Sequence, residues 1–153
     1  MAMTAGSRVF IDTNILVYAN LGQSPFHRHA VARLQELQDN DCSLYVNRQV
    51  LREYLAAMTR PGTLTADIPV ISLVEDVRGF ENDLIVLDDV PAVTDKLLET
   101  VGQYSVAGKQ IHDANIVATM LAFGIPALLT HNIADFQRFA EIIDVLPLLP
   151  GSE

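Results

Sequence analysis

Short apolar runs alternate along this chain with longer segments of helical periodicity, and this alternation constrains the possible folds more than any other feature. The runs cover residues 8–12, 43–46, 84–87 and 126–130, and a last one lies near residues 144–146. Such short apolar runs are typical of buried strands. Strands joined through helices form parallel sheets that are covered on both faces, with right-handed crossovers. The sequence therefore predicts an α/β fold, in three α/β/α layers around a mainly parallel, twisted central sheet.

The segments between these runs carry apolar side chains at spacings of three and four residues, as amphipathic helices do. In residues 48–59 one such stripe consists of Val50, Leu51, Tyr54, Leu55 and Met58. A proline and a glycine follow at positions 61 and 62 and end this helix. The expected helices cover residues 25–39, 48–59, 69–82, 91–104, 112–123 and 135–141.

Length, composition and cysteine content predict a single domain in a reducing compartment. Half of the 153 residues are apolar, which suffices for the core of one domain over residues 1–153, with residues 1–7 as a flexible extension. Cys42 is alone, which excludes a disulfide framework and a cysteine zinc cluster. The most apolar stretch, residues 116–129, is shorter than the ~20 residues of a membrane helix. We therefore expect a cytoplasmic protein without a membrane partner.

The formal net charge of −9 at pH 7 bears on the possible partners. Proteins that bind nucleic acid through electrostatics alone do so with a basic field. Taken by itself, the acidic balance therefore argues against a nucleic acid partner.

Polar side chains follow the first and fourth predicted strands directly. They are Asp12, Thr13 and Asn14 after the first strand, and Thr130, Asn132 and Asp135 after the fourth. In open α/β sheets, ligands bind beyond the carboxyl ends of the strands. Two further acidic residues lie on predicted helices, Asp113 at a helix start and Glu53 beside an apolar stripe. These positions are the candidates for a functional site.

These residues stand in four motifs that resemble those of the PIN domain family. In chain order the motifs are Phe10-Ile11-Asp12-Thr13-Asn14, Arg52-Glu53-Tyr54-Leu55, Ile111-His112-Asp113-Ala114 and Thr130-His131-Asn132-Ile133-Ala134-Asp135-Phe136. The resemblance covers nearly the whole chain. The length of the chain is similar to that of the single-domain toxins of VapBC toxin–antitoxin modules.

The resemblance implies a PIN-like fold and a metal-dependent ribonuclease activity. It implies four catalytic carboxylates that bind metal, with Asp12 and Asp113 as the principal ligands, Glu53 as the third acidic residue and Asp135 as the fourth. Asn132 stands where many family members have a further Asp. The choice between Asn132 and Asp135 as the last ligand is therefore open.

Electrostatics favours a metal ion at such a site. Two carboxylates about 4 Å apart repel by roughly 4 kcal/mol at an effective dielectric constant near 20, so a cluster of four needs cations or protons. Oxygen ligands without cysteine or paired histidine favour Mg²⁺ or Mn²⁺ over zinc. One or two such ions could activate a water for phosphodiester hydrolysis, with Glu53 or Asp135 as the base. Part of the acidic excess would then be the catalyst itself, which makes RNA compatible with an acidic chain.

The remaining polar residues of the motifs have supporting roles in this hypothesis. Thr13, Asn14, Thr130 and Asn132 would orient the ligands or contact phosphate. The cationic or titratable side chains near the motifs would hold the RNA backbone, and they are Arg48, Lys109, His112 and His131.

The resulting functional hypothesis is a cytoplasmic endoribonuclease toxin that forms a homodimer and is inhibited by a cognate antitoxin. One alternative is a PIN-like module that binds a partner without cutting RNA. Another is a phosphoryl-transfer protein with a flavodoxin-like sheet, in which an Asp after a strand is the nucleophile. Asn14 counts against one form of the second alternative, because a dehalogenase-type phosphatase has an Asp there.

Overall fold

The computed structural model describes residues 6–61 and 67–149, and within them five strands form one parallel sheet. The strands are β1 (Arg8–Ile11), β2 (Ser43–Asn47), β3 (Ile85–Leu87), β4 (Ala127–Thr130) and β5 (Asp144–Pro147). Their order in the sheet is β3-β2-β1-β4-β5. In the register of the central strands, Phe10 of β1 lies between Tyr45 of β2 and Leu128 of β4.

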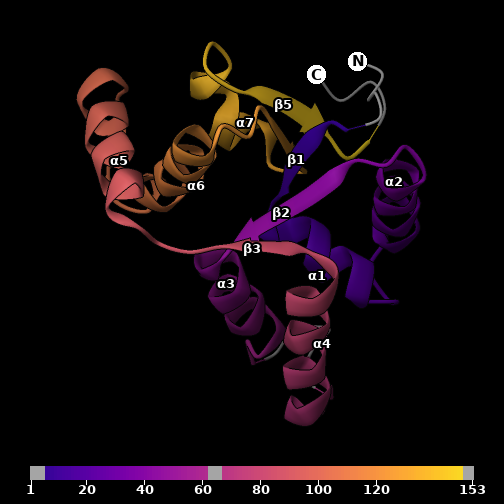
Figure 1. Ribbon diagram of the computed structural model, residues 1–153. Helices are drawn as coiled ribbons and strands as arrows, with labels where there is room; N and C mark the ends of the chain where they lie inside the picture. The colour runs from indigo at the N-terminus through magenta and orange to yellow at the C-terminus, as the bar shows by residue number, and fades with distance from the viewer. Residues whose placement is uncertain (1–5, 62–66, 150–153) are drawn as a thin grey trace.

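Helices connect the strands and cover both faces of the sheet. They are α1 (Thr13–Asn20), α2 (His27–Asp39), α3 (Arg48–Met58), α4 (Val70–Asp83), α5 (Pro91–Gln103), α6 (Gln110–Phe123), α7 (Ile133–Phe136) and the 3₁₀ helix η1 (Gln137–Phe139). From β1 to β3 the chain moves one way across the sheet, and from β3 to β5 it moves back. Right-handed crossovers therefore place α1 to α4 on one face and α5 to α7 on the other (Figure 1). The predicted three-layer α/β/α fold with a parallel sheet is confirmed.

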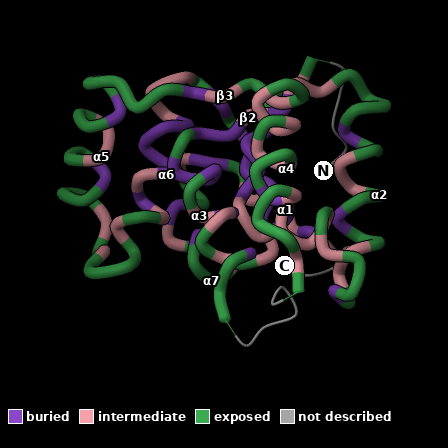
Figure 2. The backbone as a smooth tube through the Cα atoms, turned by 90° about the horizontal axis from the view of Figure 1, so that it is seen from below, coloured by how far each residue is buried: buried purple, intermediate pink, exposed green. Residues whose placement is uncertain are grey.

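The core lies between the sheet and the inner sides of the helices, where the buried backbone gathers in Figure 2. The central strands β1 and β4 are buried along almost their whole length, including Phe10, Ile11, Leu128 and Leu129. Strands that are buried on both faces read as continuous apolar runs, which is why the sequence reveals them. Helix α6 lies between the sheet and α5 and is buried from Ile116 to Met120.

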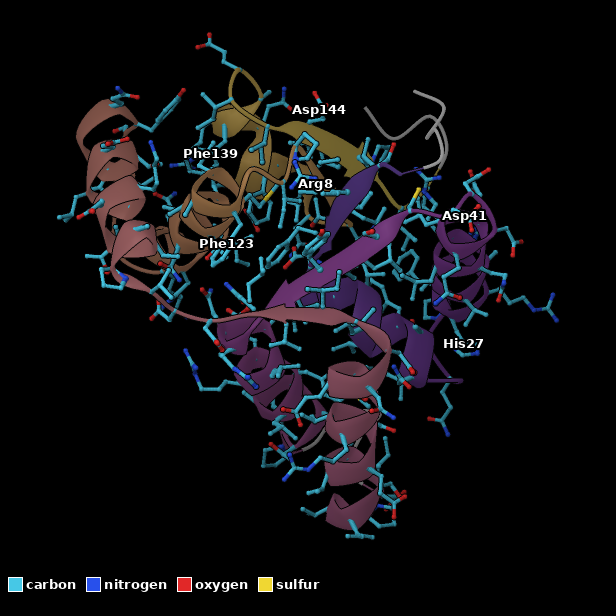
Figure 3. All side chains as sticks on the ribbon, viewed as in Figure 1. Arg8, His27, Asp41, Phe123, Phe139 and Asp144 are labelled. Carbon is cyan, nitrogen blue, oxygen red and sulfur yellow. The ribbon has the colours of Figure 1, made fainter. Side chains whose placement is uncertain are left out.

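Arg8 ties the start of β1 to the end of α6. Its guanidinium donates hydrogen bonds to the backbone carbonyls of Phe123 and Gly124 (Figure 3). Gly124 ends the helix with a φ of 67°, in the left-handed region that favours glycine. A cation at a helix C-terminus also interacts favourably with the helix dipole.

Helix α1 is the main element that the sequence analysis did not predict. It begins directly after β1, and Asp12 caps it, because the Asp12 carboxylate accepts a hydrogen bond from the Thr13 amide at 2.8 Å. Its sequence after the cap, from Ile15 to Ala19, is a run of apolar residues without the polar intervals of an amphipathic helix. The fold decides its conformation, because α1 is enclosed between α2 and α3.

Most other boundaries lie within two residues of the predicted ones. The helix expected at residues 135–141 is instead α7 followed by η1, and it begins two residues earlier. Of the expected extension at residues 1–7, residues 1–5 lie outside the described residues. The Gly6 amide donates to the Asp41 carbonyl, and the Ser7 carbonyl accepts from the Ser43 amide. In the described part of the chain, every helix is too short or too polar to cross a membrane.

Candidate active site

The site is centred on the carboxyl ends of β1 and β4, the neighbouring strands at which the direction of the chain across the sheet reverses. Such a switch point is where open α/β sheets bind ligands. Asp12 follows β1, and Thr130 ends β4. The Thr130 hydroxyl donates a hydrogen bond of 2.7 Å to Oδ2 of Asp12. Both side chains are buried, with Asp12 only 6% exposed.

Hydrogen bonds join the first and last sequence motifs into one network. Besides Thr130 and the Thr13 amide, Asp12 accepts from Nδ2 of Asn14 at 3.2 Å. Asn14 in turn accepts from the His131 amide at 3.1 Å, and the Thr130 hydroxyl accepts from the Asn132 amide at 3.0 Å. The polar residues that follow the two strands therefore orient the Asp12 carboxylate.

Glu53, on α3, is linked to the residues after β1 through Thr13. Helix α3 begins where β2 ends, and the Asn47 side chain caps it by accepting from the Val50 amide at 2.9 Å. Glu53 lies in the second turn, where the Thr13 hydroxyl donates to its Oε1 at 2.9 Å. Gln49 donates to the other carboxylate oxygen at 3.3 Å. Thr13 thus links the first motif to the second.

Asp113 and Asp135 stand in the first turns of α6 and α7. Burial, and after it the charges of Asp135, Asp12 and Glu53, raise the pKa of Asp113 to about 7 against a lowering by Arg138. Burial also raises the pKa of Asp12 to about 6, although its hydrogen bonds from Thr130 and Thr13 oppose the rise. Asp113 is therefore close enough to each of the other three predicted carboxylates to feel its charge.

A cavity of about 470 Å³ opens between these carboxylates, and Asp12, Glu53 and Asp113 line it together with Thr13, Asn14 and Asn132. Asp135 lines a second pocket of about 760 Å³, which shares Asn132 with the first. Thr130 is completely buried and lines neither pocket. The structure thus brings the predicted acidic residues to one edge of the sheet, with Asp135 at the rim.

The predicted RNA-contacting residues are more dispersed. Arg48 forms ion pairs with Glu81 and Asp88 at 3.1 and 3.2 Å and does not line the acidic pocket. Lys109 and His112 are exposed beside Asp113 at the start of α6. The ring of His131 packs against Phe26 and Tyr18, with centroids 4.4 and 5.7 Å away.

Five residues of the acidic pocket and one nearby cation were not predicted from the sequence. The five are Val17, Tyr18, Ala56, Ala57 and Arg60. Arg60 lines the acidic pocket two helical turns after Glu53, a spacing that could have revealed it. Val17 and Tyr18 line the pocket from α1, the helix that was not predicted. Arg138 approaches Asp113 only through the fold, and it donates to the Ser105 carbonyl and to Gln110.

The donor set suits a hard divalent cation. In residues 6–61 and 67–149, no three His, Cys, Asp or Glu side chains already stand close enough to coordinate one ion together. The carboxylates are nevertheless the oxygen donors that such ions prefer. Burial and repulsion disfavour the charged form of Asp113, and a nearby cation would favour it. The chemistry of these residues therefore fits a divalent ion, and their side chains would have to move together to coordinate it.

Comparisons with known proteins give a family and a fold that match this chain. A model of the PIN domain family matches residues 9–142. No curated protein matches the chain. Among the similar solved structures is VapBC2 from Rickettsia felis bound to a promoter DNA fragment, with 20% identity and a TM-score of 0.69 over 92% of this chain and 98% of that one.

Two further structures share the fold. The sarcin-ricin loop-cleaving toxin VapC20 of Mycobacterium tuberculosis is 16% identical, with a TM-score of 0.67 over 91% of this chain and 99% of that one. The DNA-bound VapBC of Salmonella typhimurium is 17% identical, with a TM-score of 0.66 over 94% and 99% of the two chains. At these identities the likeness is one of fold.

Proposed function

Because this chain belongs to the PIN domain family and gathers four carboxylates at the switch point of its sheet, we propose that it is a metal-dependent endoribonuclease toxin of the VapC type. Its substrate is RNA, and its cofactor is Mg²⁺ or Mn²⁺. A cognate antitoxin inhibits it in the cytoplasm. The activity is a hydrolysis of phosphodiester bonds.

The observation that carries this proposal is that Asp12, Glu53 and Asp113 line one pocket, where burial and neighbouring charges raise the pKa of Asp12 and of Asp113. Carboxylates in such surroundings are stabilised when a cation binds between them. Asp12, Glu53 and Asp113 would hold the ion, and Asp135 or Asn132 would complete its ligands. Only oxygen donors are offered, which favours Mg²⁺ or Mn²⁺.

A bound ion would supply Lewis acidity towards the scissile phosphate. The residues of the chain supply orientation and proton transfer. Thr13, Asn14 and Thr130 hold the Asp12 carboxylate in place, and Thr13 also holds Glu53. A carboxylate oxygen of Glu53 or of the exposed Asp135 would accept the proton of the attacking water.

Contacts to the RNA backbone come from few cations in this acidic chain. Arg60 lines the pocket, and the charge of Arg138 lowers the pKa of Asp113. Lys109, His112 and His131 flank the site and stay candidates for phosphate contacts. Arg48 is the weakest of the predicted contacts, because two acidic side chains already engage it.

The antitoxin partner is proposed from the structural neighbours, which include complexes named VapBC. The chain also offers an apolar surface for protein partners. On α4, which projects from the body of the molecule in Figure 1, Val70 and Ile71 are 65% and 64% exposed. Exposed apolar side chains that cluster in this way mark interaction sites, and we include a homodimer in the proposal.

An RNA cleavage assay with Asp12→Asn tests the proposal. We expect the wild type to cut RNA with Mg²⁺ or Mn²⁺ and to stop in EDTA, and Asp12→Asn to lose activity by at least about 100-fold. Asp95→Asn on the exposed side of α5 is the matched control and should keep wild-type activity. Undiminished cleavage by Asp12→Asn would refute the proposal. A wild type that binds no Mn²⁺ in calorimetry would favour the non-catalytic binding module.

A further inference from the structure

Gln49 is a buried amide between α3 and α6 that the proposed mechanism does not use. It lies in the first turn of α3, is 8% exposed, and uses both ends of its side chain. Its Nε2 donates to the His112 carbonyl at 2.9 Å and to Oε2 of Glu53 at 3.3 Å. Its Oε1 accepts from Nδ2 of Asn115 at 2.8 Å. A buried amide is tolerated only when it is bonded in this way.

These contacts join two acidic residues that belong to different layers. Glu53 is on α3 and Asp113 is on α6, and the two helices cover opposite faces of the sheet. Gln49 touches Glu53 directly, and it touches α6 at His112 and Asn115, which flank Asp113 on either side. The first residue before α6, Lys109, provides no side-chain cap. The bonds from Gln49 therefore anchor the turn that carries Asp113.

We propose that Gln49, with Asn115 as its partner, is a positioning residue that sets the place of Glu53 relative to Asp113. This inference rests on the proposed function. Groups that hold the ligands of a metal ion change affinity or activity by roughly 10- to 100-fold when they are removed. Misplacement of a reacting group by about 1 Å has effects of similar size. Gln49 should therefore act on Mn²⁺ affinity and on kcat.

A merely structural role for Gln49 predicts a different result, and the same interface offers a matched control. Asn47 donates to the hydroxyl of Thr119 at 3.1 Å, and both side chains are buried. This bond also joins the α3 end of β2 to α6, but it touches no carboxylate. The Thr119 hydroxyl also donates to the Asn115 carbonyl at 2.8 Å, within α6. Thr119→Val should therefore destabilise the protein as Gln49→Met does, while it keeps every hydrogen bond of the Gln49 and Glu53 side chains.

The experiment compares full-length wild type, Gln49→Met and Thr119→Val by Mn²⁺ titration calorimetry, by kcat and KM for RNA cleavage, and by Tm. We expect Gln49→Met to weaken Mn²⁺ binding by about 10-fold and to lower kcat by about 10- to 100-fold, with KM little changed. Thr119→Val should keep both Mn²⁺ affinity and kcat within about twofold at a similar loss of Tm. Asn115→Leu should resemble Gln49→Met, and it takes the place of that variant if Gln49→Met does not fold.

The outcomes separate the two proposals. If the wild type binds Mn²⁺ and cuts RNA while Gln49→Met and Asn115→Leu behave like Thr119→Val, the positioning role is overturned and the proposed function stands. If the wild type neither binds Mn²⁺ nor cuts RNA, the proposed function falls, and the positioning role falls with it.

Discussion

The carboxylate of Asp12 accepts three kinds of hydrogen bond while it lies almost wholly out of water. It bonds to a backbone amide, a hydroxyl and a carboxamide, from Thr13, Thr130 and Asn14. These donors stabilise the charged form, whereas burial and the charge of Glu53 oppose it, and the pKa of about 6 is the balance. The residue is thus held in one orientation and left in need of a counter-charge.

Removal of the Thr130 hydroxyl should disturb this balance. In Thr130→Val, Asp12 loses a 2.7 Å hydrogen bond and the Asn132 amide loses its acceptor. We expect kcat to fall by about 10-fold or more and the free energy of unfolding to fall by about 1–3 kcal/mol. Thr100→Val is the control, because this buried hydroxyl bonds only within α5, to the Lys96 carbonyl at 2.7 Å. Equal kcat values for the two variants would contradict the assigned role of Thr130.

The raised pKa values of Asp12 and Asp113 predict a dependence of stability on pH in metal-free protein. A carboxyl whose pKa is higher in the folded state than its ordinary value of 3.8 favours folding while it is protonated. That contribution is present below about pH 4 and is lost as the pH rises to about 6 for Asp12 and about 7 for Asp113. In EDTA, the Tm of the wild type should therefore fall between about pH 4 and pH 7 relative to that of Asp12→Asn.

Thermal melts of the two proteins across this pH range measure the effect. Groups remote from Asp12 cancel in the difference, and the shift of Asp113 that depends on the Asp12 charge adds to it with the same sign. Added Mn²⁺ should raise the wild-type Tm more at pH 8 than at pH 5, because protons compete for the same carboxylates. A difference between the two proteins that does not change with pH would contradict the shifted pKa of Asp12.

At the scale of elements, helix ends decide where the acidic residues lie. Helix α1 starts at Asp12 without a loop, α3 starts at the end of β2, and α6 is held by Arg8 and Gly124 at its far end. Asp12 is therefore fixed at a helix cap, Asp113 and Asp135 in a first helical turn, and Glu53 in the second turn of α3. Their positions depend on the length and capping of these elements more than on the loops.

Two glycines at helix ends should respond to alanine in opposite directions. Gly124 has a φ of 67°, and a Cβ there would also lie 3.6 Å from the Arg8 guanidinium. We expect Gly124→Ala to lower the free energy of unfolding by about 1 kcal/mol. Gly102 lies inside α5 with open space around it, so Gly102→Ala should raise that free energy by about 0.5–1 kcal/mol. Urea unfolding measures both, and the same sign for the two variants would contradict this account.

At the scale of the whole molecule, the sequence predicts features that depend on neighbouring residues, such as strands and the residues at their ends. It does not predict contacts between residues that are distant in the chain. The strands were predictable because each is a continuous apolar run, and Asp12 and Thr130 follow from their places at strand ends. Helix α1 was not predicted because its sequence is a continuous apolar run without helical periodicity. Tyr18, which lines the pocket from α1, was therefore not predicted either. Gln49 and Asn115 are 66 positions apart, and Arg138 approaches Asp113 from η1, so only the packed structure pairs them.

The charge of the whole molecule sets how RNA binding should depend on salt. With a net charge of −9, the protein has no broad basic field. Among the cations near the acidic residues, Arg60 lines the pocket and Arg138 acts on Asp113. Each phosphate contact to single-stranded RNA contributes about −0.7 to the slope of log K against log salt, so two contacts give about −1.4. We expect a slope of this size for a short RNA bound to the inactive Asp12→Asn protein at fixed Mg²⁺.

Arg60→Gln in that background should reduce the slope by about 0.7, since one phosphate contact is lost. Arg28→Gln on the exposed side of α2 is the control and should leave the slope unchanged. Fluorescence anisotropy across a KCl series measures all three proteins. A steep slope, of about −5 or more in magnitude, would mean that RNA is held by a basic surface away from this pocket. A shallow slope that depends on Arg60 would place the RNA backbone at the acidic site, where Arg60 contacts a phosphate.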